Sequence, residues 1–122
     1  DLSFSGESLN ANARNDVMLP VSRAEEMSAF YLGKVDPKDP RASPLFADFV
    51  GAPPIWLTAG DTEILLDDTR RMTERLRDQG VAVTEMIEHD LPHVWPFFQN
   101  LLPEARATLS KIATWIRVLQ PS

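Results

Sequence analysis

The clearest signal in the sequence is a change of hydrophobic period between residues 55 and 88. Residues 55–59 form a short apolar run that ends at Gly60, a pattern typical of a buried strand. Between residues 64 and 79 the apolar positions recur every three or four residues, from Leu65 to Leu76, which predicts one face of a helix. Residues 81–88 are again rich in Val, Thr, Met and Ile, and they predict a second strand.

Two further helices are predicted outside this unit. Ser22 and Glu25 have capping-box spacing, which places Ser22 at the N-cap of a short helix that ends at Gly33. Pro103 suits the first turn of a last helix, whose apolar positions continue to residue 119. Residues 1–21 show no sustained period, and the prolines of residues 34–54 predict a long packed loop.

The order strand, helix, strand, helix predicts an α/β fold. About sixteen helical residues separate the strands, which suits a parallel right-handed crossover. Parallel strands are normally buried on both faces within larger sheets, so two such strands alone are not a stable object in water. We therefore expect residues 1–122 to be the C-terminal portion of one larger domain, a three-layer sandwich with parallel strands.

Composition narrows the classes of partner. The chain has 12 Lys and Arg against 18 Asp and Glu, and this net charge of −6 argues against nucleic acid, whose phosphates need clustered cations. No run of eighteen apolar residues predicts a membrane span, and no basic-then-apolar leader is visible. The lack of cysteine excludes a disulfide scaffold and a Cys nucleophile, and it fits a reducing compartment, so we expect a cytoplasmic location.

Polar loops follow both predicted strands, where parallel sheets bind their ligands. Asp61 and Glu63 follow the first strand, and His89 and His93 follow the second. An acid and an imidazole that meet there could form a pair in which the acid orients the ring and the ring moves a proton. The simpler alternatives are that Asp61 or Thr62 caps the next helix and that His89 is structural or exposed.

His93 differs from His89 in its surroundings. It lies between a proline and the apolar residues 94–98, a useful place for a base beside an acyl pocket, although an aromatic core cluster would have the same pattern. A metal site is not expected, because Pro92 disfavours the helix that would align His89 with His93 and no third ligand is evident. The sequence has no Gly-rich phosphate loop and no G-x-S-x-G elbow, so no nucleophile is identified in this chain.

Four motifs occur in an order that resembles one known family. They are DLSFSGES at residues 1–8, DPKDPRASPL at 36–45, PPIWL through LLDD at 53–68, and DLPHVW at 90–95. Together they resemble the C-terminal third of bacterial hormone-sensitive-lipase-like esterases, which have the α/β-hydrolase fold. The resemblance implies a Ser-His-acid triad with no cofactor and no metal, in which His93 is the histidine and the missing N-terminal part supplies the serine.

The acid departs from the family pattern, in which many relatives have Asp followed by Pro. Here the matching position is Glu63 followed by Ile64, so Glu63 is the expected acid and Asp61 the runner-up. The implied substrate is a small carboxylic ester. The alternatives are a hydrolase of amides, lactones or carbamates, and a non-catalytic interaction fragment or pseudoenzyme; the chain could also form a homo-oligomer.

Overall fold

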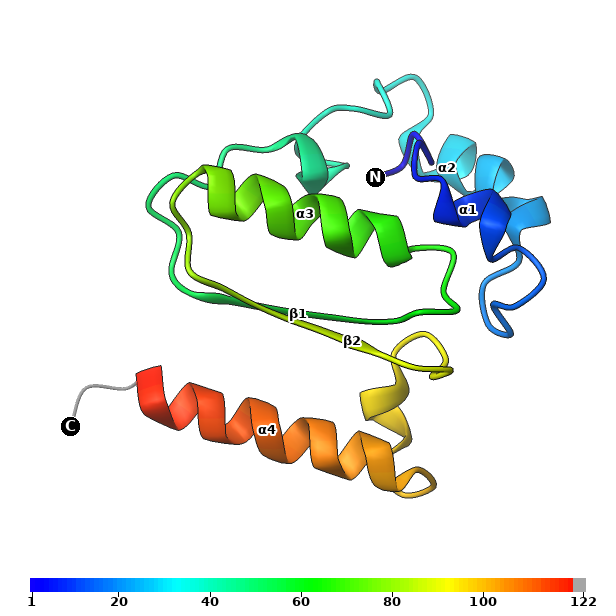
Figure 1. The fold of residues 1–122 in the computed structure, drawn as a ribbon. Coiled ribbons are helices and arrows are strands. Elements are labelled where there is room, and N and C mark those ends of the chain that lie inside the picture. The colour runs from blue at the N-terminus through cyan, green and yellow to red at the C-terminus, as the bar shows by residue number, and fades with distance from the viewer. Residues whose placement is uncertain (120–122) are drawn as a thin grey trace.

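The computed structural model describes residues 1–119 and has three layers (Figure 1). A sheet of β1 (Ile55–Gly60) and β2 (Val83–Glu88) lies between α3 (Leu66–Asp78) and α4 (Pro103–Leu119). The remaining elements are α1 (Ser8–Ala11), α2 (Ala24–Leu32) and the 3₁₀ turns η1 (Val21–Arg23), η2 (Pro44–Phe46) and η3 (Trp95–Phe98). This arrangement confirms the α/β prediction.

The two strands are parallel and pair in register along their whole length. Ile55 is opposite Val83 and Gly60 is opposite Glu88. The hydrogen bonding continues one residue further, because the Asp61 amide donates to the Glu88 carbonyl at 2.9 Å. Both strands therefore end at the same edge of the sheet, and the two loops that follow them start side by side.

The two helices that flank the sheet are held by different contacts. On the α3 side, Ala59, Leu76 and Val81 are buried in a small apolar core. On the α4 side, the rings of Trp56 and Trp115 meet edge to face with centroids 5.7 Å apart. These contacts place α3 and α4 on opposite faces of the sheet, although all six residues of β2 remain only partly buried.

The start of α2 differs from the sequence prediction. Ser22 lies inside the η1 turn, and α2 begins at Ala24 with Arg23 at the N-cap and no capping side chain. The predicted N-cap at Ser22 is therefore wrong. The physical reason is that the 3₁₀ turn runs directly into the helix, and its Val21 carbonyl accepts from the Ala24 amide. The predicted end at Gly33 is correct, with φ of +58°.

The other predicted elements are confirmed with small shifts of their bounds. The helix after the first strand begins at Leu66, and the second strand begins at Val83 instead of residue 81. The proline-rich loop packs on α3, where Arg75 Nε donates to the Ala47 carbonyl at 2.8 Å. The short helix α1 lies in a segment that was predicted as irregular. Among residues 1–119, no helix combines the length and the hydropathy needed to cross a bilayer.

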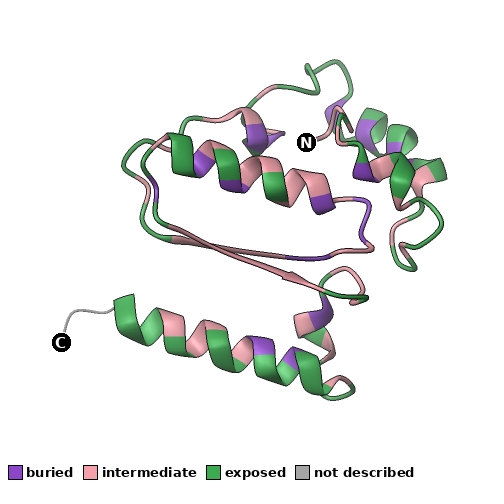
Figure 2. Ribbon diagram, in the orientation of Figure 1, coloured by how far each residue is buried: buried purple, intermediate pink, exposed green. Residues whose placement is uncertain are grey.

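Several elements carry exposed residues (Figure 2), and some of these residues are large and apolar. Phe30 on α2 is 94% exposed, and Phe97 beside the second loop is 82% exposed. Both outer edges of the two-stranded sheet also carry unpaired backbone groups. Exposed aromatic rings and free strand edges are surfaces that recruit another chain.

We expect the isolated 122-residue chain to self-associate because these surfaces have no cover within it. Light scattering on the purified chain should report a mass above that of one copy, 13.7 kDa. A chain that stays monomeric and unfolds cooperatively would show that the two strands and their helices form an independent unit.

Candidate active site

A histidine and a glutamate meet where the two strands end. His93 Nδ1 lies 2.6 Å from Glu63 Oε2. The Glu63 side chain is only 4% exposed, whereas the His93 side chain is 31% exposed. The acid is therefore enclosed, and the imidazole is half-buried with one ring nitrogen engaged and Nε2 left for another partner.

The glutamate is held at both carboxylate oxygens. Its second oxygen, Oε1, accepts a hydrogen bond from the Gly60 amide at 2.6 Å. Two short donors to one buried carboxylate fix its orientation, since rotation of the carboxylate would break at least one of them. The glutamate is thus a rigid acceptor for the histidine.

Gly60 permits the close approach of the two loops. A Cβ atom built on Gly60 would lie 2.0 Å from the Leu91 carbonyl oxygen, which is far inside van der Waals contact. Any other residue would therefore displace the loop that carries His93. The requirement is steric, because the glycine belongs to strand β1 and needs no left-handed conformation.

The histidine loop is anchored on both sides of His93. Trp95 is 1% exposed, and its Nε1 donates to Thr108 Oγ1 of α4 at 3.1 Å. Its amide also donates to the Pro92 carbonyl at 3.1 Å. Val94, which lies between Pro92 and Trp95, has φ of +54°, an unfavourable conformation for a β-branched residue. Such strain persists only where the surroundings impose it, and it indicates a loop held in one shape.

A second histidine–acid pair lies beside the first. Asp61 Oδ2 is 2.7 Å from His89 Nδ1, and Asp61 Oδ1 accepts from the Asp90 amide at 2.8 Å. The His89 side chain is 90% exposed, which fits one of the alternatives that the sequence left open for it. Asp61 is therefore paired with His89 and not with His93. It does not cap α3 either, whose N-cap is Leu65 without a capping side chain.

The N-terminal segment holds the acid loop, which sequence reasoning missed. Asn12 Nδ2 donates to the carbonyls of Asp61 and Glu63 at 3.0 and 2.8 Å. Asp16 Oδ2 accepts from the Ile64 amide at 2.9 Å. These polar residues lie in a stretch without hydrophobic period. The sequence therefore shows that they can form hydrogen bonds, but it does not show that their partners lie in the acid loop.

Electrostatics differ between the two pairs. The hydrogen bond to Glu63 raises the pKa of His93; burial opposes this, and the charges of Glu63 and Asp16 add to the rise. The hydrogen bond to Asp61 likewise raises the pKa of His89, and His89 in turn lowers the pKa of Asp61. Both rings therefore bind a proton more readily than a free histidine, but only the ring of His93 is partly buried.

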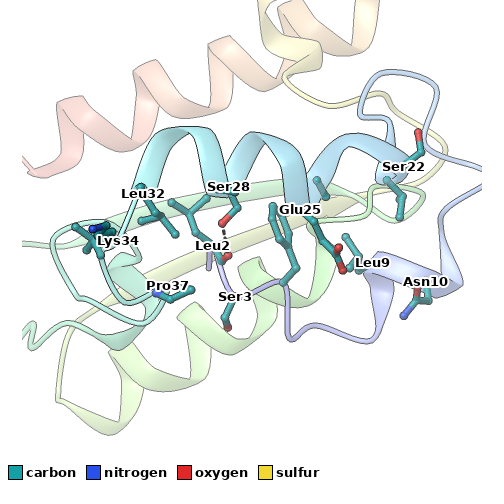
Figure 3. A pocket seen from close by; sticks show the side chains of 16 residues that line it. Leu2, Ser3, Leu9, Asn10, Ser22, Glu25, Ser28, Leu32, Lys34 and Pro37 are labelled. Carbon is teal, nitrogen blue, oxygen red and sulfur yellow. Dashed lines mark hydrogen bonds between the residues drawn. The ribbon is translucent and has the colours of Figure 1, made fainter.

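A hollow in the described part of the chain lies away from this pair. It has a volume of about 900 Å³ and separates the N-terminal segment from α2 (Figure 3). Leu2, Ser28 and Leu32 line it, and Ser28 Oγ donates to the Leu2 carbonyl at 2.8 Å. Neither His93 nor Glu63 borders it. Within residues 1–119 no three His, Asp or Glu side chains gather as ligands for a metal ion.

Comparison with known proteins identifies the class. A family model described as the alpha/beta hydrolase fold matches residues 1–97, and the chain belongs to this family. It corresponds to the C-terminal 40% or so of a bacterial esterase of the hormone-sensitive lipase family, as the motif resemblance implied. Both sequence relatives and solved structures support this correspondence.

Two curated relatives cover nearly the whole chain. An acetyl-hydrolase of Streptomyces hygroscopicus is 30% identical over 117 residues, which are 96% of this chain and 39% of that protein. An esterase of Acinetobacter venetianus is 35% identical over 114 residues, 93% of this chain and 38% of that protein. The chain therefore spans about two fifths of the length of these relatives.

Solved structures agree with the fold. The chain superposes on an esterase of the bacterial hormone-sensitive lipase family with a TM-score of 0.93 and 38% identity, over 98% of this chain and 40% of that one. A hormone-sensitive lipase from a metagenome library gives a TM-score of 0.93 and 32% identity, over 98% and 41% of the two chains.

The Glu63→Gln variant of the complete protein should lower the pKa of His93. The glutamine removes the negative charge that favours the imidazolium, whereas burial, which opposes it, remains. Titration of the ring protons by NMR measures the shift. In the Asp61→Asn control the pKa of His89 should fall and that of His93 should stay; a fall at His93 in the control alone would show that the pairing is misassigned.

The same pair makes stability depend on pH. The pKa of His93 is higher in the folded chain than in the unfolded one, so its contribution is complete below the ordinary value of 6.5 and is lost as pH rises through the raised pKa. The stability advantage of the parent over Glu63→Gln should therefore shrink across that interval when both are unfolded by denaturant at a series of pH values.

The Gly60→Ala variant should destabilise the complete protein, by about 1–3 kcal/mol for an overpacked site. The added methyl group would overlap the Leu91 carbonyl and push the His93 loop away from Glu63. Thermal unfolding of the variant and its parent measures the loss. A Gly60→Ala variant as stable as the parent would contradict a steric role for Gly60.

Proposed function

We propose that the complete protein hydrolyses carboxylic esters with a Ser-His-Glu triad, to which this chain contributes His93 and Glu63. The observation that carries the proposal is the 2.6 Å contact between His93 Nδ1 and Glu63 Oε2 at the ends of adjacent parallel strands. Membership of a family whose relatives are named esterase and acetyl-hydrolase supports the same reaction class. The nucleophilic serine would come from the part of the protein outside this chain.

In the acylation step, His93 Nε2 takes the proton of the serine hydroxyl while the serine oxygen attacks the ester carbonyl carbon. The C=O electron pair moves to the oxygen and forms a tetrahedral intermediate. When this collapses, the bond to the alkoxy group breaks, and the imidazolium gives its proton to the departing alcohol. The products of this half-reaction are an acyl-serine and the free alcohol.

In the deacylation step the same ring acts on water. His93 Nε2 accepts a proton from the water that attacks the acyl-serine, and it returns the proton to the serine oxygen as the carboxylic acid leaves. Glu63 remains ionised throughout and does not relay the proton. It holds Nδ1 protonated, which leaves Nε2 as the basic nitrogen, and it stabilises the imidazolium that forms twice per turnover.

The proposed domain organisation follows from the same argument. Residues 1–122 form one portion of a single α/β-hydrolase domain, and the missing portion would cover the sheet and supply the serine elbow. The substrate class is a small carboxylic ester, and its hydrolysis by this triad needs no cofactor. The isolated chain, without a serine in that role, is expected to be inactive.

The decisive variant is His93→Ala in the complete protein, with hydrolysis of p-nitrophenyl acetate as the measurement. Loss of the base should reduce kcat by roughly 10⁴-fold or more, and Glu63→Gln by about 10³–10⁴-fold, because both act on one proton transfer. His89→Ala is the matched control: it removes an imidazole from the same loop and should change kcat little, since His89 is exposed and paired with Asp61.

Unchanged turnover in His93→Ala would refute the triad assignment. Equal losses in His93→Ala and His89→Ala would indicate that the loop, and not the ring of His93, carries the effect. If the parent hydrolyses no ester at all, the complete protein is a non-catalytic member of the family. Faster turnover of an amide, lactone or carbamate than of the ester would correct the substrate class.

A further inference from the structure

The side-chain amide of Asn12 joins the N-terminal segment to the loop that carries Glu63. Both hydrogens of the Asn12 amide are used: Nδ2 donates to the Asp61 carbonyl at 3.0 Å and to the Glu63 carbonyl at 2.8 Å. Both partners are acceptors, so only a group with two donors satisfies them. Asn12 lies 51 residues from Glu63 along the chain, and the contact therefore depends on the fold and not on local sequence.

Asn12 is itself held in place by its backbone. The backbone amide of Asn12 donates to the Ser8 carbonyl at 2.9 Å. The backbone carbonyl of Asn12 accepts from the backbone amides of Asn15 and Asp16 at 2.9 Å each. Ser8 Oγ donates to the Ile64 carbonyl at 2.7 Å, and Asp16 Oδ2 accepts from the Ile64 amide. The segment from Ser8 to Asp16 is thus hydrogen-bonded to the backbone of the acid loop at three positions, residues 61, 63 and 64.

The grip matters because of what the same loop does next. The Glu63 carboxylate must reach back to the Gly60 amide at 2.6 Å and forward to His93 at 2.6 Å. The direction of that side chain follows the direction of its backbone, and the Asn12 side-chain amide holds the Glu63 carbonyl of that backbone. A loop free to rotate would lengthen one of two short hydrogen bonds.

We propose that Asn12 is a positioning residue, which holds the acid loop so that Glu63 is aligned with His93. The proposal rests on the proposed function for its effect on turnover, but not for its effect on the geometry of the pair. The side-chain hydrogen bonds of Asn12 go to the backbone of residues 61 and 63, and not to the ring or the carboxylate of the pair.

The test uses Asn12→Asp in the complete protein. A carboxylate has the same shape as the amide, but it has no donor and repels two carbonyl oxygens. Two quantities are measured: kcat and KM for p-nitrophenyl acetate, and the low-field NMR resonance of the His93 Nδ1 proton that Glu63 accepts. A misplaced acid should lower kcat by about 10- to 100-fold with little change in KM, and should weaken or shift that resonance.

Asn10→Asp is the matched control. Asn10 is exposed on α1, two residues before Asn12, which is the C-cap of that helix, and it borders the hollow beside α2 (Figure 3). It introduces the same charge without touching the acid loop, and it should leave both quantities at the parent values. Asn12→Ala removes the donors without adding charge, and decides the matter if Asn12→Asp does not fold.

The outcomes separate the two proposals. If Asn12→Asp and Asn12→Ala match Asn10→Asp in both kcat and the resonance, Asn12 does not position the acid and the inference is overturned. A lower melting temperature with an unchanged resonance also overturns it, because the role would then be stability alone. If the resonance is lost in the Asn12 variants but the parent has no esterase activity, the proposed function fails while the positioning role holds.

Discussion

The in-register parallel pairing of β1 with β2 is the constraint on which the site depends. Because Gly60 is opposite Glu88, both strands end at one edge, and the acid loop and the histidine loop start side by side. Pairing alone would not bring the two loops into contact. Because Gly60 has no side chain, the Leu91 carbonyl can occupy the space where a Cβ would be. Register and glycine together bring residues 30 apart in sequence within 2.6 Å of each other.

Sequence patterns predicted the parts of this arrangement that depend on hydrophobic period. A switch from apolar runs to helical spacing and back defines the strand–helix–strand unit, since the core selects one face of each element. That an acid and a histidine could meet was predictable because parallel strands share their carboxyl edge, whereas the choice of Glu63 with His93 came from the resemblance to the esterase family. The observed bounds differ from the predicted ones by a residue or two, because Leu65 lies just before the helix and Val81 lies before the second strand.

Other parts have no periodic signal. Ser22 has the sequence of a helix cap, but a 3₁₀ turn competes for the same residues and wins, so local chemistry was misleading there. The grip of Asn12 on the acid loop is a long-range hydrogen bond, and nothing near position 12 in the sequence indicates its partner. The left-handed Val94 is opposed by intrinsic preference, and it exists only because Pro92 and the buried Trp95 hold both sides of it.

The two histidine–acid pairs show why burial, and not proximity, selects the candidate base. Both have nearly the same contact, 2.7 Å for His89 with Asp61 and 2.6 Å for His93 with Glu63. Around His89, however, water competes for both partners, and exposed ion pairs of this kind contribute little. Glu63 is enclosed and has no alternative solvent partner, so its charge acts on His93 with less screening. A ring that must gain and lose a proton at a fixed nitrogen needs such an unscreened, oriented acceptor on its other side, and only the buried pair offers it.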